Sequence, residues 1–107
     1  MLEEINNYVT QQNKIVEKAM AGKYEGAYEN NELRVYSVGN SYTKICRKGS
    51  VHSFIAMKDI NTKSIQCRKG DVLKAASWKA PANHARGSVF EPKTTENFNW
   101  TGPDYLV

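Results

Sequence analysis

The stretch YTKICRKGSVHSFIAM, residues 42–57, decides the fold class because it holds two strand patterns joined by a turn. Residues 42–47 alternate in a way that places one set of side chains on each face of a strand. The two sets are Tyr42, Lys44 and Cys46 on one side and Thr43, Ile45 and Arg47 on the other. Lys48-Gly49-Ser50 is typical of a tight hairpin connection, and residues 51–57 form the second pattern. The stretch therefore predicts an antiparallel hairpin.

Short strand patterns continue on both sides of this hairpin. We expect strands at residues 33–38, 64–67 and 72–76, with turns at residues 30–31, 39–40, 59–62 and 69–71. A parallel pair needs a crossover of about a dozen residues or more, and these connections are shorter. The sequence therefore predicts a small, mostly antiparallel sheet of 4-5 short strands over about residues 33–76.

Residues 2–21 predict an amphipathic helix that stops at Gly22. Its apolar stripe consists of Leu2, Ile5, Val9, Val16 and Met20, reinforced by Tyr8, Ile15 and Ala19. Its polar side, which we expect to face water, consists of Asn6, Asn7, Gln11, Gln12 and Asn13. The stripe can pack on the chain's own sheet or on a helix of another subunit. The first arrangement gives an α+β fold with the N-terminal helix packed on the sheet.

The last third of the chain has no clear period. We expect a loop at residues 77–87, in which Ser77 caps a short turn, Pro81 begins a helical turn and Gly87 ends it. Residues 88–90 follow as one more short strand. The isolated apolar anchors of the tail are Phe98, Trp100, Tyr105 and Leu106. A chain of 107 residues is expected to form one domain, residues 1–107.

Composition limits the class of protein. Hydrophobic residues make up 40% of the chain, which argues against intrinsic disorder. The apolar runs are too short to cross a bilayer, and the acidic residues 1–4 do not resemble a secretory signal. We therefore expect no membrane contact and two reduced thiols, Cys46 and Cys67. These cysteines and the histidines His52 and His84 lack metal-ligand spacing, so no metal is expected.

Charge is distributed unevenly along the chain. Residues 1–40 carry four Lys or Arg and six Glu, a net charge of −2. Residues 41–90 carry ten Lys or Arg and two Asp, a net charge of +8, and residues 91–107 carry −2. A basic block of this kind favours an anionic partner. The alternative is a well-solvated strand surface that resists edge-to-edge aggregation.

The densest group of candidate ligand-binding residues follows the last predicted strand of the sheet. It consists of Lys74, Ser77, Trp78, Lys79, His84 and Arg86. Arg binds phosphate oxygens with two hydrogen bonds, Lys adds attraction, and Trp offers a ring on which a base stacks. The alternative is that Trp78 is a packing residue and the cations are solvated. The segment contains no Walker or dinucleotide-binding glycine pattern.

A second candidate surface is basic and lies at the predicted hairpin tips. It consists of Lys44, Arg47, Lys48, Arg68 and Lys69, with Tyr42 nearby. Basic tips make good contacts to a phosphate backbone, but they are also ordinary turn residues.

Catalysis has little support in the residues. Ser53 or Ser77 paired with a histidine lacks a third partner, since the basic block contains only two Asp residues. Nothing in the local sequence marks either cysteine as a nucleophile. We therefore expect a protein that is not an enzyme, with no catalytic residue and no cofactor.

The segment GDVLKAASWKAPANHARGSVF, residues 70–90, resembles a motif of small uncharacterised proteins encoded by tailed bacteriophages. Residues 42–45, 51–55 and 101–106 fit the same resemblance, which covers about residues 40–107. Where the family often has a basic residue after Pro-Ala, this chain has Asn83. The resemblance implies a phage origin and action in the cytoplasm of an infected bacterium. Small phage proteins of this kind blunt host immunity, bind nucleic acid or alter a host enzyme.

Three functions follow from these observations. The first is non-enzymatic binding of an anionic nucleotide-type ligand, as a sponge that sequesters a cyclic or ADP-ribose-like immune signal. The second is binding of single-stranded DNA or RNA, with Tyr42 or Trp78 stacked on bases. The third is inhibition of a host protein or a minor role in the virion. A homo-oligomer stays open as well, because pockets between subunits enclose more of a ligand.

Overall fold

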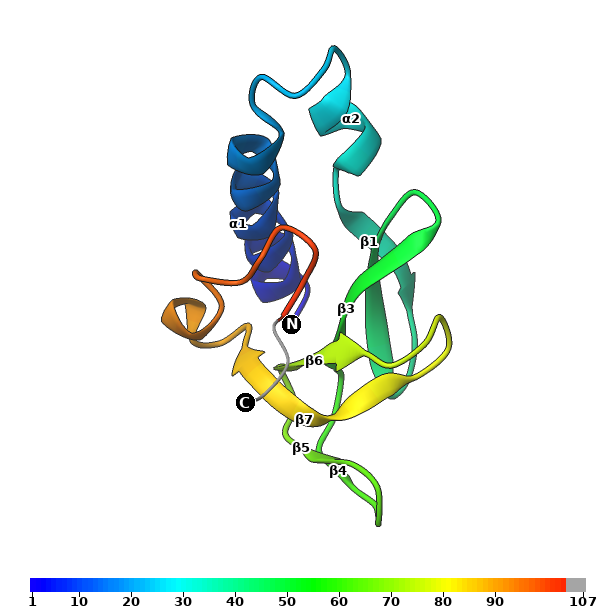
Figure 1. Ribbon diagram of the computed structural model, residues 1–107. Helices are drawn as coiled ribbons and strands as arrows, with labels where there is room; N and C mark the ends of the chain where they lie inside the picture. Colours follow the sequence, from blue (N-terminus) through cyan, green and yellow to red (C-terminus); the bar gives the residue numbers. More distant parts are fainter. Residues whose placement is uncertain (104–107) are drawn as a thin grey trace.

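The computed structural model describes residues 1–103 and has an α+β fold, as predicted (Figure 1). One long helix, α1, lies along one face of a five-stranded sheet. The elements are α1 (Leu2–Met20), α2 (Ala27–Asn31), β1 (Arg34–Val38), β2 (Tyr42–Arg47), β3 (Ser50–Ala56), β4 (Ile60–Asn61), β5 (Gln66–Cys67), β6 (Asp71–Ala75), β7 (Pro81–Ser88) and the 3-10 helix η1 (Pro92–Thr94).

The main sheet is antiparallel throughout and has the strand order β1-β2-β3-β6-β7. Its centre is the predicted hairpin, in which Tyr42 lies opposite Ala56 and Lys44 opposite Phe54. Strands β4 and β5 form a separate two-stranded hairpin between β3 and β6 in the chain. Short connections explain the antiparallel order, because every neighbour along the sheet is reached without a crossover helix.

The inner face of the sheet, which α1 covers, carries the main core. Ile5, Tyr8 and Val16 of α1 are buried against Ile45 and Ile55 of the sheet. Burying one such side chain contributes about 1.5–3 kcal/mol, so the apolar stripe of the helix largely accounts for its position. The stripe therefore packs on the chain's own sheet, while Leu2 at the helix start stays exposed.

The outer face of the sheet carries a second, smaller apolar cluster. Its buried members are Phe54, Ala56, Cys67 and Leu73. The β4–β5 hairpin contributes Ile60 and Ile65 to the edge of this cluster and so covers one end of the outer face. The other end of that face, beside β1 and β2, has no such cover from the hairpin.

One side of α1 departs from the prediction that its polar residues face water. Gln12 is buried and donates a hydrogen bond to the carbonyl oxygen of Thr95 over 2.9 Å. Asn13 donates to the carbonyl of Leu33 over 3.0 Å and accepts from its amide over 2.8 Å. These amides bind backbone segments that cover α1 from the side, and buried backbone groups need such partners. Residues far apart in sequence decide this, so the helical period alone misplaced the amides.

The predicted loop at residues 77–87 is wrong for most of its length. Residues 81–88 form strand β7, which pairs with β6 through an irregular register that contains two bulges. Pro81 is tolerated because it is the first residue of an edge strand, where its missing N–H breaks no ladder. Gly87 is required by close packing, since a Cβ there would lie 2.8 Å from the Thr94 carbonyl oxygen. The strand expected at residues 88–90 therefore lies earlier. The turn predicted at residues 30–31 is the end of helix α2, and the turn predicted at residues 59–62 contains strand β4.

Residues 102 and 103 pack against the inner face of the sheet. A Cβ on Gly102, whose φ is +131°, would lie 2.4 Å from the carbonyl oxygen of His52 on β3. Pro103 is fully buried, and the ammonium of Lys74 on β6 donates to its carbonyl over 2.9 Å. Phe98 and Trp100 pack against the main core as predicted anchors. The other two anchors, Tyr105 and Leu106, and Asp104 lie outside the described residues.

Candidate functional site

Two exposed aromatic rings meet on the outer face of the sheet. Tyr36 of β1 and Trp78 of the β6–β7 loop lie edge to face, with ring centroids 5.0 Å apart and an angle of 78°. Their side chains are 57% and 41% exposed. Large aromatic side chains usually bury most of their surface, so these two rings form an exposed aromatic surface on the sheet.

A lysine joins the two rings. The Lys44 ammonium lies 4.2 Å from the centroid of the Trp78 ring and 5.5 Å from that of Tyr36. A cation over an aromatic face is attracted by the ring quadrupole, worth about 0.5–1 kcal/mol at an exposed site. Arg34 lies opposite Cys46 in the register and so shares this face with Lys44.

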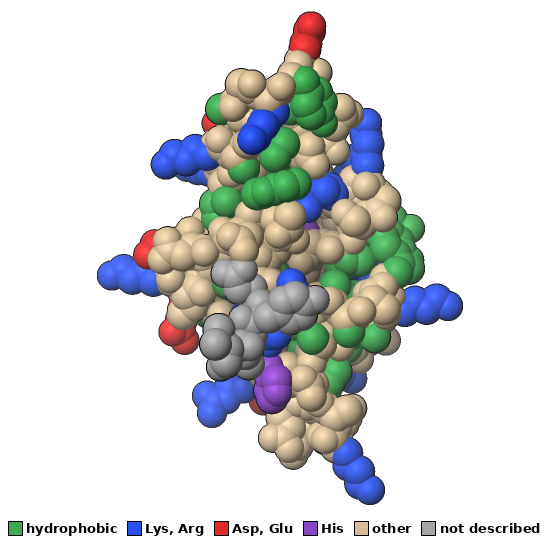
Figure 2. Space-filling model, in the orientation of Figure 1, with side chains coloured by type: hydrophobic (Ala, Val, Ile, Leu, Met, Phe, Trp, Pro, Cys, Tyr) green, Lys and Arg blue, Asp and Glu red, His purple; other side chains and the backbone are tan. Residues whose placement is uncertain are grey.

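We define the outer patch as Arg34, Tyr36, Lys44 and Trp78. Strands β1 and β2, which carry three of its members, contain no Asp or Glu. Figure 2 shows hydrophobic side chains gathered at the right-hand margin of the molecule, with Lys and Arg side chains projecting beside them. Figure 1 places β1 and the β6–β7 loop at this margin. The outer patch therefore combines aromatic surface with positive charge.

A groove opens beside the Trp78 ring. It has a volume of about 260 Å³ and is lined by Gly49, Ser50 and Val51 on one side and by residues 75–78 on the other. The lining residues other than Trp78 are small, and the groove is shallow and open to solvent. A flat group that entered it would lie against backbone and indole.

The structure separates the six residues of the predicted central cluster. Ser77, Trp78 and Lys79 stay together in the β6–β7 loop, where the Ser77 hydroxyl oxygen accepts from the amides of Lys79 and Ala80. Lys74 points to the inner side, toward Pro103.

His84 and Arg86 belong to β7 and to a different part of the surface. The Arg86 guanidinium donates to the carbonyl oxygen of His84. His84 lines an open groove against the β4–β5 hairpin, together with Lys63, Ser64, Gln66 and Asn83. The six residues therefore do not form one recess around the indole ring.

Arg47, predicted as part of the basic surface, lies inside the protein. Its side chain is on the inner face with Thr43 and Ile45, and the residue is only 9% exposed. The guanidinium donates to the backbone carbonyl oxygens of Asn31 and Trp100 and lies 5.0 Å from the Trp100 ring. Burial lowers the pKa of Arg47. Strand alternation already placed Arg47 on this side, so its structural role was readable from the sequence.

The remaining basic tips lie apart from one another. The Lys48 ammonium is 3.4 Å from the Asn30 side-chain oxygen of α2. Lys69 acts on Glu4 at the start of α1. Hydrogen bonds with the Glu4 backbone and the N-terminal amine are the main causes that lower the pKa of the Glu4 carboxyl, and the charge of Lys69 adds a smaller contribution. The amide of Arg68 is held by Asp71 over 2.8 Å, and that of Lys69 by Asp59 over 2.9 Å. Only Lys44 of the predicted basic surface joins the outer patch.

A chain of buried hydrogen bonds crosses the main core. The Tyr8 hydroxyl lies 2.8 Å from the Ser53 hydroxyl, which lies 2.9 Å from Nδ1 of His52. Burial lowers the pKa of His52 to about 3, with further contributions from the charges of Arg47 and Lys74, and burial raises the pKa of Tyr8. His52 Nε2 has no hydrogen-bond partner among residues 1–103. The serine and histidine touch, yet both are sealed in the core, where no substrate reaches them.

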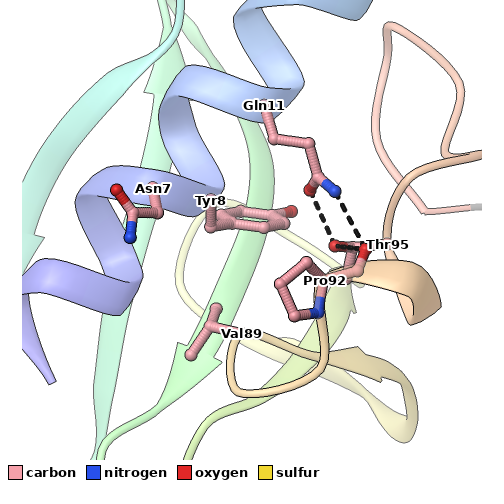
Figure 3. Close-up of a pocket in the computed structure, with 6 residues that line it drawn as sticks. All are labelled: Asn7, Tyr8, Gln11, Val89, Pro92 and Thr95. Carbon is pink, nitrogen blue, oxygen red and sulfur yellow. Dashed lines mark hydrogen bonds between the residues drawn. The ribbon is translucent and has the colours of Figure 1, made fainter.

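A small recess beside α1 is shown in Figure 3. It has a volume of about 60 Å³ and lies between the helix and η1. The Gln11 side chain closes one side, because it donates to the Pro92 carbonyl over 2.9 Å and accepts from the Thr95 hydroxyl over 2.7 Å. The recess is too small for a nucleotide, since pockets for such ligands measure about 300–1,000 Å³.

Other kinds of site find little support in the part of the chain that the structure describes. No group of three His, Cys, Asp or Glu side chains in residues 1–103 is arranged to hold a metal ion. Both cysteines are free, and burial is the main cause that raises the pKa of each thiol. Of the helices in this range, none combines the length and apolar character needed to span a bilayer.

The sequence prediction missed Arg34 and Tyr36. These residues share one face of a predicted strand, and an exposed aromatic beside an arginine was the available signal. The register shift between Val35 and Ser37 places Ser37 opposite Lys44, with Tyr36 beside it, and the β6–β7 loop brings Trp78 against Tyr36. A bulge of this kind adds a residue to one strand and re-aims a side chain, and it is not readable from alternation.

Comparison with known proteins places the chain in a family without assigning it an activity. Residues 2–106 match a family of unknown function (DUF7717), and the chain belongs to this family. No curated protein and no solved structure matches it.

Proposed function

We propose that this member of the family binds single-stranded nucleic acid through the outer patch. The observation that carries the proposal is the Lys44 ammonium 4.2 Å from an exposed indole, with Tyr36 against the same ring. Proteins that bind single strands combine aromatic rings, on which bases stack, with cations that follow the phosphate backbone. Both kinds of group meet here on one sheet face.

The arrangement of the rings favours a strand over a duplex. Tyr36 and Trp78 stand at 78° to each other, so one flat base cannot stack on both, and two successive bases can. Bases are available for stacking only where they are not paired and stacked within a helix. Lys44 and Arg34 would then neutralise the phosphates that link the two bases.

The open shape of the surface also bears on the choice of ligand. A sponge for a nucleotide signal needs a recess that encloses its ligand. The groove beside Trp78 is open and holds about 260 Å³, which supports a strand that continues beyond the groove. The resemblance to tailed-phage proteins implies action in the cytoplasm of an infected bacterium. The proposed binding itself involves no enzymatic step.

The proposal is tested by fluorescence anisotropy with labelled DNA and RNA strands of about 12 nucleotides, a length within the range that one small domain covers. We expect binding that weakens as salt rises from about 50 to 200 mM, and weaker binding to a duplex of the same length. Trp78→Ala and Tyr36→Ala should each weaken single-strand binding by about 5- to 100-fold. Tyr24→Ala is the matched control, because Tyr24 is equally exposed at 58% but lies in the α1–α2 connection. Duplex binding equal to single-strand binding, or binding unchanged in both patch variants, would contradict the proposal.

A further inference from the structure

The groove beside Trp78 lies where two strands of the sheet separate. The register of β3 with β6 consists, in the described chain, of Phe54 opposite Leu73 and Ile55 opposite Val72. Strand β3 continues from this point to Ser50, and β6 continues to Ala75. Residues 50 and 51 remain paired with β2, and Ala75 remains paired with β7. The sheet is therefore split between β3 and β6 at this end.

Two residues of the C-terminal segment contact the split from the inner side. The backbone of Gly102 packs directly on the His52 carbonyl of β3, where even a Cβ would clash. The next residue, Pro103, is buried, and its carbonyl oxygen accepts a hydrogen bond from the Lys74 ammonium of β6. Residues 102 and 103 thus contact both strands at the point where their ladder ends. On the outer side the same gap appears as the groove.

The walls of the groove offer hydrogen-bonding groups beside a flat ring. A strand edge without a ladder partner presents backbone N–H and C=O groups. On the wall formed by residues 75–78, the amides of Ala76 and Ser77 already donate to the Ala80 carbonyl. The Ser77 hydroxyl oxygen already accepts two backbone amides, over 3.3 Å and 3.2 Å, so its hydrogen remains to donate. Ser50 lines the opposite wall.

The indole has one face already in use. The Lys44 ammonium lies over the Trp78 ring and Tyr36 lies edge to face with it, so a base that stacks on Trp78 uses the part of the ring that these two side chains leave exposed. Trp78 itself lines the groove, together with Ser50 and Ser77. A planar group with hydrogen-bonding atoms on its edge is the chemical shape that fits a slot with one aromatic wall, small neighbours and polar backbone edges.

The geometry points to a nucleobase pocket: the split between β3 and β6 takes one unpaired base of the bound strand and reads its edge. This inference rests on the proposed function and adds base selectivity to it. Stacking alone is tolerant of sequence, because every base has an aromatic face. Hydrogen bonds to the edge of an inserted base do depend on sequence, because the donors and acceptors differ from base to base.

The test compares homopolymers of adenine, cytosine and thymine nucleotides of equal length by anisotropy. We expect the best and worst of the three to differ in Kd by roughly tenfold or more. Ser50→Leu, which narrows the groove from an exposed position, should reduce this spread to about twofold or less. Binding of the weakest homopolymer should change less than about twofold in this variant, because the outer patch is intact. Ser64→Leu, an equally exposed change in the β4–β5 turn, should keep the full spread.

The outcomes separate the pocket from the outer patch. Equal affinity of the wild-type protein for the three homopolymers, or selectivity that survives Ser50→Leu, overturns the nucleobase pocket and leaves the proposed function standing. Absence of binding to all three overturns the proposed function and the pocket with it. Selectivity lost in both Ser50→Leu and Ser64→Leu also overturns the pocket, because the effect is then not specific to the groove. Circular dichroism and thermal unfolding check that both variants are folded.

Discussion

The two faces of the sheet each pair a cation with a tryptophan ring, but in one pair the cation is buried and in the other the ring is exposed. The inner face carries Arg47 and Trp100, and the outer face carries Lys44 and Trp78, so each has a cation over an indole ring. On the inner face the cation is buried and donates to the carbonyls of Asn31 and Trp100, which fixes the surrounding backbone. On the outer face the Trp78 ring is 41% exposed, and Lys44 beside it is half-buried. The same pair of residue types therefore indicates structure or binding according to burial, which alternation along β2 decides.

The largest effect should come from closing the space between Gly102 and β3. Gly102→Ala places a Cβ 2.4 Å from the His52 carbonyl oxygen and forces an alanine into φ +131°. We expect a loss of about 4 kcal/mol or more in the free energy of unfolding, measured by urea denaturation. Gly22→Ala is the control, because Gly22 also has positive φ but no atom lies within 4 Å of the added Cβ. It should cost only about 1–2 kcal/mol. Equal losses in the two variants would show that the contact with His52 does not matter.

The next effect contrasts the cores of the two faces. Ile55 is fully buried beneath α1, so Ile55→Ala should cost about 2–5 kcal/mol in the free energy of unfolding. Trp78→Ala removes a larger side chain from the outer patch but should cost no more than about 1 kcal/mol, since much of that ring is exposed. Chemical denaturation of the two variants measures both losses in the free energy of unfolding. A cost for Trp78→Ala that matches the cost for Ile55→Ala would mean that the indole is a packing residue.

A third effect is the pH dependence of the inner face. Burial lowers the pKa of His52 to about 3 in the folded state, from an ordinary value of 6.5. Between these values the unfolded chain binds a proton that the folded chain does not, so folding stability falls as pH is lowered. The loss should amount to roughly 1.4 kcal/mol for each pH unit between about pH 6 and pH 4.

The control for this pH effect is His52→Gln, which removes the titrating ring. Thermal unfolding at a series of pH values should show a smaller acid loss in this variant than in the wild type. Equal slopes below pH 6 would mean that other groups cause the acid sensitivity. Binding to the outer patch should follow a separate profile, because no histidine belongs to it.

The smallest effect concerns a single charge. Lys44→Gln should weaken single-strand binding by a few-fold and lower the slope of log Kd against log salt by about 1, because one phosphate contact is lost. Lys63→Gln, in the β4–β5 turn away from the outer patch, should leave both the affinity and the slope unchanged. An effect of Lys63→Gln as large as that of Lys44→Gln would indicate that only net charge matters.

The sequence predicted the helix and the central hairpin because each depends on local pattern. Residues 42–47 form β2 as expected, and α1 ends within one residue of its predicted end. Strand β7 was missed because Pro81 and Gly87 suggest a turn when read locally, whereas β6 and Thr94 decide their conformation. The candidate site divides in the same way. Trp78 and Lys44 were identified by residue type, but their meeting with Tyr36 depends on the register of β1 with β2 and on the path of the β6–β7 loop.

The proposal assigns nucleic-acid binding to the outer face of the sheet and support of the fold to the inner face. It is tested most directly by two-dimensional nuclear magnetic resonance of the isotope-labelled protein during titration with an oligothymidine of about 12 nucleotides. We predict that the amide signals of Tyr36 and Lys44 and the indole signal of Trp78 shift in a saturable manner, while those of Ile5 and Trp100 stay in place. Shifts confined to α1, or no shifts at concentrations well above micromolar, would contradict the account.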